Sequence, residues 1–248
     1  MLPMKQKAFS AFPDQGLQFL HSLKRNNNRD WFHSHKSTYE QYVKQPMTEL
    51  IAALAQEFQK FAPEMLASPK VSAYRIYRDT RFSKDKSPYK THIAVVFPRS
   101  GLGKHEGAGL YLHISTQELL IGGGLYMPLP EDLNAVRNHI VDHPDRFFAI
   151  LEHDRFRKIF GSLGGDRLQR VPQGFPVGHV AADYLKYKQF LAARNFPPRV
   201  ATTPRFYKLV LETFQAILPL VRFLNDPILR TRRLKKRQEA FLNLGADV

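Results

Sequence analysis

The residues best suited to chemistry gather in one short stretch, Ile76–His92, with the sequence IYRDTRFSKDKSPYKTH. The planar head group of arginine grips phosphate or carboxylate through two hydrogen bonds, and lysine adds a mobile positive charge. This density of cations predicts a site for an anion, either the phosphate of a small molecule or a nucleic-acid backbone. The residues expected to contact the anion are Arg75, Arg78, Asp79, Arg81, Lys84 and Lys90.

A solvated loop is the alternative interpretation of this stretch, because runs of charge often serve only solubility. Two features favour a site. Aromatic side chains alternate with the charges, and Pro88 restricts the turn that carries them. These aromatic residues are Tyr74, Tyr77, Phe82 and Tyr89, of which Phe82 and Tyr89 are equally suited to a core. Asp79 and Asp85 can pair with neighbouring cations and hold them in place.

Histidine and tyrosine side chains in and near the stretch are candidates for proton transfer. His92 and His113 lie on strands expected to be neighbours, where Asp79 would be an orienting carboxylate. The candidate catalytic groups are therefore His92 and Tyr74, and His113 is a candidate ligand contact. No metal site is expected, because neither an HExxH motif nor a cluster of acidic residues is present. A structural role for both histidines remains the alternative.

Three successive glycines occur in the segment Ile121–Pro128, IGGGLYMP. Glycine permits a close approach of the backbone to a ligand or a strand bulge, so Gly123 and Gly124 are candidate contacts at a sheet edge. The segment is not a phosphate-binding loop, because it lacks the GxxxxGK[ST] pattern. Asn27, in a triple-asparagine turn, and Arg29, which follows this turn, are also expected to contribute polar groups to the anion site.

Helical periodicity frames the chemistry at both ends of the chain. Apolar residues recur at helical spacing over 14–27, 27–45 and 46–61, and again over 130–153 and 204–225. Between them the pattern changes to strands, expected over 70–78, 92–98, 107–115 and 117–128. The sequence thus predicts an α+β fold with N-terminal helices, a central and mainly antiparallel sheet of at least four strands, and C-terminal helices. Residues 1–226 are expected to form one domain, followed by a basic tail, 227–248.

Composition sets outer limits on function. The chain has 248 residues, no cysteine and a net charge of +15, so thiolate metal sites, disulfides and cysteine nucleophiles are excluded. The basic balance favours an anionic partner. We expect no cofactor, no membrane segment and a cytoplasmic protein, because no apolar stretch has the length of a signal peptide or a membrane span.

Three quoted segments resemble one family. RIYRDTRFSKDKSPYKTH, followed by GLYLHIS and GGGLYMP, is similar to the family known as Domain of Unknown Function 2461. FLHSLKRNNNRDWFHSHKSTYEQYVKQP and LQRVPQGFPVGHVAADYLKYKQF resemble its other blocks, so the likeness runs from about Phe12 to Asn225. It implies a soluble protein and a set of site residues, without a reaction.

Two functions of different class remain open on these residues. One is a basic cleft that binds a small ligand through phosphate or carboxylate, with or without catalysis. The other is a nucleic-acid-binding module that uses the same surface together with the six basic residues of Arg230–Arg237. The oligomeric state is not indicated by the sequence.

Overall fold

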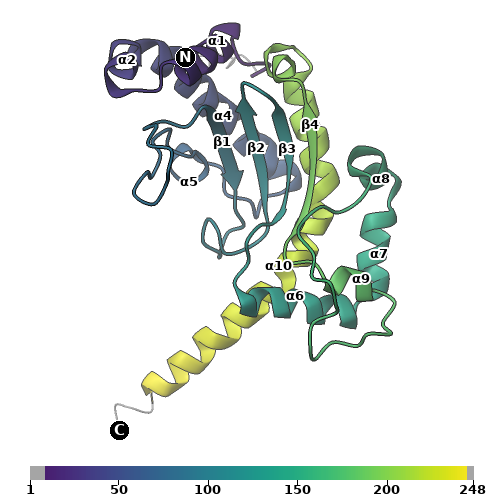
Figure 1. Cartoon of the computed structure of the whole chain (residues 1–248). Helices are drawn as coiled ribbons and strands as arrows, with labels where there is room; N and C mark the ends of the chain where they lie inside the picture. The colour runs from purple at the N-terminus through teal and green to yellow at the C-terminus, as the bar shows by residue number, and fades with distance from the viewer. Residues whose placement is uncertain (1–8, 245–248) are drawn as a thin grey trace, which may run out of the picture. The chain divides into compact units, whose positions relative to one another are not determined.

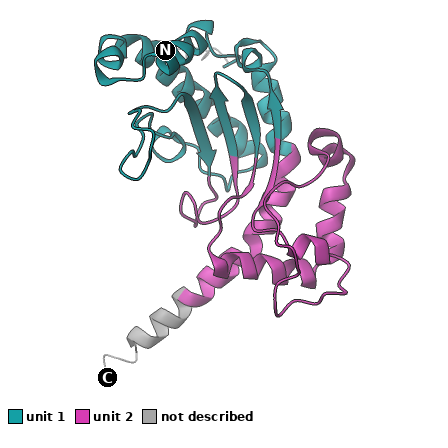
Figure 2. Ribbon diagram, in the orientation of Figure 1, with its two compact units in different colours: residues 1–97, 111–122, 194–215 teal, residues 98–110, 123–193, 216–248 magenta. Residues whose placement is uncertain are grey.

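Contacts within the chain divide it into two units, drawn in teal and magenta in Figure 2. The computed structural model describes residues 9–244. The first unit comprises residues 1–97, 111–122 and 194–215, and the second comprises residues 98–110, 123–193 and 216–248. Both candidate histidines and the whole basic stretch belong to the first unit, so this unit holds most of the candidate site residues.

Helices at the start of the first unit form where the sequence places caps and apolar stripes. Asn28 caps α2 by accepting a hydrogen bond from the Trp31 amide at 2.9 Å, and Pro46 occupies the first turn of α4. A π-helical turn, η1, leads into α4. The helical elements are α1 (Asp14–Arg25), α2 (Arg29–Ser34), α3 (Lys36–Tyr39), η1 (Glu40–Lys44), α4 (Gln45–Phe61), α5 (Pro69–Ser72) and the 3₁₀ turn η2 (Pro198–Thr202).

Aromatic rings form the centre of the first unit. Phe58 on α4 meets Phe97 edge to face at 5.1 Å, and Phe97 meets Phe214 at 5.7 Å. All three side chains are fully buried. In Figure 1, α4 accordingly lies behind β1. Replacing a fully buried phenylalanine by alanine typically costs about 3–5 kcal/mol, so this contact fixes the sheet firmly on α4.

The sheet has four antiparallel strands in the order β1-β2-β3-β4, and the fold is α+β, as the sequence predicts. Its strands are β1 (His92–Phe97), β2 (Gly109–Ser115), β3 (Leu119–Leu125) and β4 (Phe190–Phe196). Along β2, buried Leu112 and Ile114 alternate with partly exposed Tyr111 and His113. One face of the strand is therefore core, and the other carries polar side chains.

The strand expected over 70–78 is wrong in its first part. Ser68 accepts a hydrogen bond from the Val71 amide, and Pro69 occupies the first helical position, so residues 69–72 form α5 instead. Beyond α5 the chain is extended, but it pairs only at single points, between Ala73 and Val95 and between Tyr77 and Tyr89. It is the outer arm of a hairpin that leads into β1.

The fourth strand of the sheet comes from much later in the chain. β4 contains Ala193, Arg194 and Asn195, residues without strong strand preference. It lies at the edge of the sheet, where its second half is largely exposed. Because the second half of this edge strand is exposed, apolar residues need not alternate with polar ones there. The sequence of β4 therefore does not show the period-2 pattern of a half-buried strand.

The second unit is built on α6 (Pro130–Asp142), α7 (Pro144–Glu152), α8 (Asp154–Phe160) and α9 (Ala182–Leu185). A long helix, α10 (Phe206–Leu244), begins in the first unit and continues through Pro219 and Pro227 into the basic segment. Within that segment Arg232 donates to Glu131 and Asp132, and Lys235 donates to Glu131. Residues 245–248 of the expected tail lie outside the described residues. None of the described helices is both long and apolar enough to cross a membrane.

His139 is a buried histidine inside the second unit. Its ring lies 4.5 Å from that of Phe223, and its Nε2 has no hydrogen-bond partner among the described residues. Burial above all, then the nearby charges of His143, Arg230 and Arg146, lowers the pKa of His139 to about 4, against an opposing effect of Asp226. The ring is therefore neutral in the folded protein at neutral pH.

We expect this histidine to make the second unit less stable in acid. Its folded pKa is lower than the usual value near 6.5, so the unfolded chain takes up the proton first as the pH falls. The free energy of unfolding should fall by about 2 kcal/mol between pH 8 and pH 5 on this account. Urea titrations of His139→Phe should show a flatter pH dependence, whereas His21→Gln, at an exposed position, should leave it as in the parent protein.

Candidate functional site

The basic stretch Ile76–His92, here called the basic hairpin, folds back on itself. The Arg78 amide donates to the Pro88 carbonyl at 2.9 Å, and the Lys90 amide donates to the Ile76 carbonyl at 2.7 Å. Between these bonds the side chains alternate, so that Ile76 is buried and Tyr77 is 53% exposed. The hairpin thus has an inner apolar side and an outer polar side.

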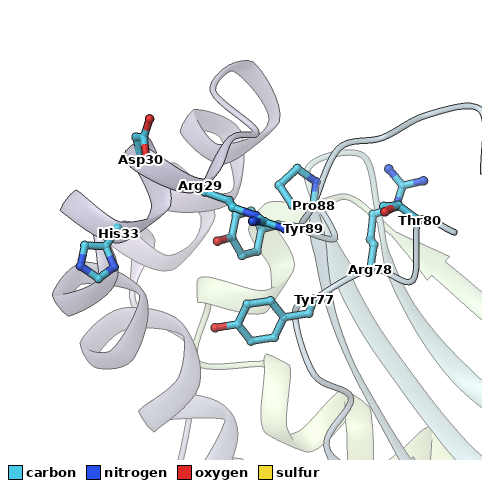
Figure 3. A pocket seen from close by; sticks show the side chains of 8 residues that line it. All are labelled: Arg29, Asp30, His33, Tyr77, Arg78, Thr80, Pro88 and Tyr89. Atoms are coloured by element: carbon cyan, nitrogen blue, oxygen red, sulfur yellow. The ribbon is translucent and has the colours of Figure 1, made fainter.

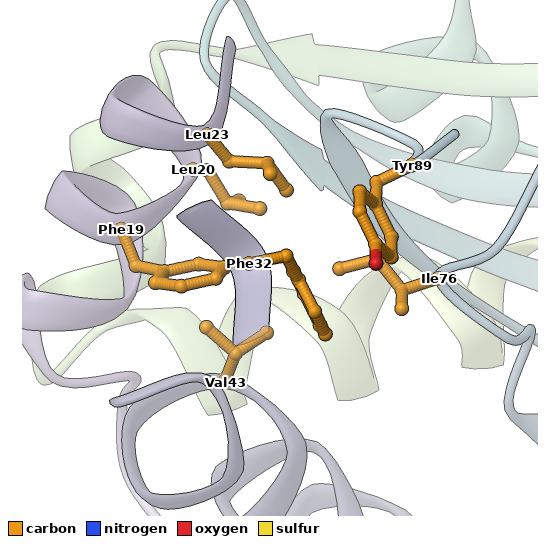
Figure 4. Close-up of a cluster of buried hydrophobic side chains, with 7 residues drawn as sticks. All are labelled: Phe19, Leu20, Leu23, Phe32, Val43, Ile76 and Tyr89. Atoms are coloured by element: carbon orange, nitrogen blue, oxygen red, sulfur yellow. The ribbon is translucent and has the colours of Figure 1, made fainter. Parts of the chain in front are cut away.

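Apolar packing attaches the inner side of the basic hairpin to the N-terminal helices. Figure 4 shows Ile76 and Tyr89 facing side chains that come from α1, α2 and η1. The rings of Phe32 and Tyr89 stack at 4.0 Å, and Tyr89 is only 6% exposed. The cluster consists of Phe19, Leu20, Leu23, Phe32, Val43, Ile76 and Tyr89. Of the two aromatic residues suited equally to core or site, Tyr89 is therefore in the core, whereas Phe82 is 95% exposed.

A polar clamp reinforces this attachment. The side-chain amide of Asn27 donates to the Tyr89 carbonyl at 2.9 Å, and its oxygen accepts from the Tyr89 amide at 3.1 Å. One side chain therefore satisfies both backbone groups of a buried residue 62 positions away in the chain. The triple-asparagine turn holds the basic hairpin against α1.

Two hollows lie where the basic hairpin meets the helices. The first, here called the tyrosine hollow, has a volume of about 490 Å³ and is shown in Figure 3. Arg29 extends from α2 towards Tyr89 in that view, and the ring of Tyr77 lies beside them. The lining residues are Arg29, Asp30, His33, Tyr77, Arg78, Thr80, Pro88 and Tyr89. Arg29 makes no hydrogen bond or ion pair with any residue that the structure describes.

The second hollow, here called the lysine hollow, has a volume of about 420 Å³. It collects cations from two distant segments, with Lys24 on α1 and Lys90 on the basic hairpin. The lining residues are Lys24, Asn27, Arg78, Asp85, Ser87, Tyr89, Lys90, Thr91 and His92. Arg78 and Tyr89 line both hollows, so the two hollows are neighbours that have these residues in common.

Carboxylates pair with the hairpin arginines, as the sequence predicts. Arg78 forms an ion pair with Asp85 and donates to the Ser83 hydroxyl at 3.3 Å. Arg81 binds Asp79 through two side-chain hydrogen bonds, of 3.0 and 2.7 Å. Hydrogen bonds from Ser87 and then from Arg78 hold the pKa of Asp85 far below its usual range. Both aspartates are therefore ionised and orient their arginines.

Lys90 is a partly desolvated cation in the lysine hollow. Its ammonium group donates to the Arg75 carbonyl at 3.0 Å and lies 5.5 Å from the centre of the Tyr74 ring. Burial first, and then the charge of Arg75, lowers the pKa of Lys90. No carboxylate among the described residues pairs with this lysine, so the ammonium group is stabilised only by a carbonyl dipole and an aromatic ring.

The two candidate histidines come together on neighbouring strands. Their rings lie 5.8 Å apart, with His92 on β1 and His113 on β2. Burial above all, then the charges of His113 and Lys90, lowers the pKa of His92, so this ring is neutral at neutral pH. Asp79, expected near these histidines, is bound to Arg81. The carboxylate that contacts this pair is Glu118, at 3.2 Å from His113 Nε2.

Other residues expected in the site lie outside both hollows. Among the described residues that line the hollows, none is from the set Tyr74, Arg75, Asp79, Arg81, Lys84 and His113. The side chains of Arg81 and Lys84 are exposed on the basic hairpin, and that of Arg75 is exposed immediately before it. Tyr74 lies under Lys90, and burial raises its pKa. These residues shape the surroundings of the lysine hollow without lining it.

Gly123 and Gly124 belong to the second unit, and backbone packing explains both. A side chain at Gly123 would place its Cβ 2.4 Å from the Gly109 carbonyl oxygen. At Gly124, where φ is 124°, the Cβ would lie 2.0 Å from the Phe190 carbonyl oxygen. Strand contacts within the second unit thus require glycine at these positions.

Several lining residues escaped sequence reasoning. Lys24, Asp30 and His33 come from α1 and α2, and nothing in their spacing marks them as part of a site. The available signal was the triple-asparagine turn, which led to Asn27 and Arg29. Within residues 9–244, no three histidine, aspartate or glutamate side chains gather in a way that could hold a metal ion.

Comparison with known proteins adds one finding. A family model described as "Conserved hypothetical protein (DUF2461)" matches residues 15–223, which include the basic hairpin and both hollows. Neither the curated proteins nor the solved structures yield a match to the chain.

Proposed function

This chain belongs to the DUF2461 family of conserved hypothetical proteins, and we propose that it binds a small ligand through a phosphate or carboxylate group. The proposed binding place is the lysine hollow. The observation that supports the proposal is the convergence of Lys24 from α1 and of Arg78 and Lys90 from the basic hairpin around one hollow of about 420 Å³.

Charge in the lysine hollow is unbalanced in favour of an anion. Among the described residues, Asp85 is the one acidic residue that lines it, and this carboxylate is already paired with Arg78. Lys90 is partly desolvated without a carboxylate partner, and Lys24 makes no ion pair with any described residue. A bound anion would stabilise both ammonium groups, and it would accept directed hydrogen bonds from Arg78.

Proton transfer to or from the bound ligand is the catalytic extension of this proposal. His92 lines the lysine hollow, and its lowered pKa keeps the ring neutral and able to accept a proton. His113, bound to Glu118, has its ring 5.8 Å from that of His92, and its charge is one of the causes that keep His92 unprotonated. We propose His92 as the candidate general base, and the reaction itself stays open.

Nucleic-acid binding is the alternative function, and one observation favours it. Phe82 is 95% exposed at the end of the basic hairpin, next to Arg81 and close in sequence to Lys84, and exposed aromatic rings among cations can stack on bases. On α10, however, Arg232 and Lys235 are bound to carboxylates of α6, which reduces the charge that the basic segment offers to a backbone. We therefore favour the small ligand over nucleic acid. We also propose that the protein is cytoplasmic.

Thermal unfolding and calorimetry with a small set of anions test the proposal. Inorganic phosphate, citrate and a single-stranded oligonucleotide would each be titrated into the full chain at constant ionic strength. We expect phosphate or citrate to raise the melting temperature in a saturable manner, because a ligand that binds only the folded state stabilises it. An oligonucleotide effect without any effect of the small anions would contradict the proposal and support the alternative.

A further inference from the structure

We propose that the ligand carries a planar ring together with its phosphate, as a nucleoside monophosphate does, and that this ring lies on Tyr77 in the tyrosine hollow. The inference rests on the proposed function, which places the phosphate in the lysine hollow. It adds the chemical class of the ligand.

Tyr77 provides a fixed aromatic surface. Its ring is 53% exposed, although it packs against Tyr89 at 5.5 Å and against Phe32 at 6.4 Å between ring centres. Tyr89 and Phe32 are themselves stacked and buried, so Tyr77 is supported from the core. A rigid ring that is supported on one side and accessible on the other is what base stacking requires.

The distribution of charge separates the two parts of such a ligand. The tyrosine hollow is lined by two arginines, Arg29 and Arg78, and by one carboxylate, Asp30. The lysine hollow has two lysines and a single, already paired carboxylate. A phosphate is therefore drawn to the lysine hollow, and an uncharged ring is better placed in the tyrosine hollow.

Arg29 adds a contact that suits a heteroaromatic ring. Its guanidinium group reaches towards Tyr89 in Figure 3 and makes no hydrogen bond with any described residue. A free guanidinium can stack on a base or donate to a ring nitrogen or carbonyl oxygen. An aliphatic phosphate would offer no planar ring to Arg29 or to the exposed face of Tyr77.

The dimensions of the two hollows agree with a ligand in two parts. Each volume, about 490 and 420 Å³, lies within the range of roughly 300–1,000 Å³ typical of small-molecule sites. Arg78 and Tyr89 line both, so a ring and a phosphate joined by one sugar would pass over residues common to the two hollows.

Calorimetry on the full chain tests the ring directly. AMP, UMP and ribose 5-phosphate would be titrated under the same conditions, since the three carry the same phosphate and differ in the base. We expect AMP or UMP to bind about tenfold more tightly than ribose 5-phosphate, as stacking on one aromatic side chain allows. Tyr77→Ala should remove this advantage and leave the affinity for ribose 5-phosphate unchanged. Tyr77→Phe should retain the advantage.

Phe82→Ala is the matched control, because Phe82 is an exposed aromatic residue of the same basic hairpin that lines neither hollow among the described residues. It should not change the preference for nucleotides. Equal affinity of the parent protein for AMP, UMP and ribose 5-phosphate would contradict stacking of a ligand ring on Tyr77, but it would not contradict a phosphate site in the lysine hollow. Failure of all three compounds to bind would contradict phosphate binding in the lysine hollow, the part of the proposed function on which this inference rests.

Discussion

Arg78→Ala is expected to weaken phosphate binding roughly 10- to 100-fold, since a hydrogen bond to a charged group contributes about 1.5–3 kcal/mol. Arg78 lines both hollows, and Asp85 and Ser83 orient its guanidinium group. Its removal takes away a directed donor and frees the carboxylate of Asp85, which then repels the anion. Isothermal titration of phosphate into the parent and variant proteins measures the loss.

Arg81→Ala supplies the matched control for this prediction. Arg81 belongs to the same basic hairpin and is also paired with an aspartate, Asp79, but it lines neither hollow among the described residues. Its removal should change the phosphate affinity by less than about threefold, since exposed charges at a distance are screened by salt. A double variant, Arg78→Ala with Asp85→Ala, separates the lost donor from the freed carboxylate. Equal losses from Arg78→Ala and Arg81→Ala would contradict a localised site.

Asn27→Ala is expected to destabilise the first unit by about 2–4 kcal/mol, because each buried backbone group that loses its partner costs about 1–3 kcal/mol. The Asn27 side chain is bonded to both the amide and the carbonyl of Tyr89, whose side chain belongs to the cluster in Figure 4. Phosphate affinity should fall too, because the clamp positions the wall that both hollows have in common. Urea unfolding monitored by the fluorescence of Trp31 measures the first effect.

Asn26→Ala is the appropriate comparison for the clamp. Asn26 is the neighbouring residue in the same turn, but its side chain is exposed and donates only to the Ser22 carbonyl within α1. Substitution there should cost about 0.5 kcal/mol or less. If the Asn27→Ala protein were as stable as the Asn26→Ala protein, the attachment of the basic hairpin would depend on apolar packing alone.

Long periodic elements were predictable from the sequence, whereas elements defined by distant partners were not. The stripe of Leu50, Leu54 and Phe58 identifies α4, because burial on one face of a helix imposes the 3.6-residue period. β4 has no such signature, since an edge strand with Arg194 and Asn195 depends on pairing with another strand. At α5, a capping serine and a following proline outweighed the β-branched and aromatic residues nearby.

In the candidate site, too, contacts between residues close in sequence were predictable, whereas contacts between distant segments were not. Ion pairs between Arg78 and Asp85 and between Arg81 and Asp79 are local, so the sequence indicated them. Lys24 enters the lysine hollow from α1, more than sixty residues before Lys90, and the packing of Leu23 and Phe32 on the basic hairpin, with the Asn27 clamp, brings it there. Likewise, Glu118 reaches His113 through the short turn between β2 and β3, which charge patterning alone does not reveal.

Crystals soaked in tungstate, an anion of phosphate shape with a strong anomalous signal, would locate the anion site most directly. The account predicts one dominant anomalous peak in the lysine hollow, within hydrogen-bonding distance of the side chains of Arg78 and Lys90. A dominant peak elsewhere, for example at the exposed Arg75 or Arg81, with none in the lysine hollow, would contradict it.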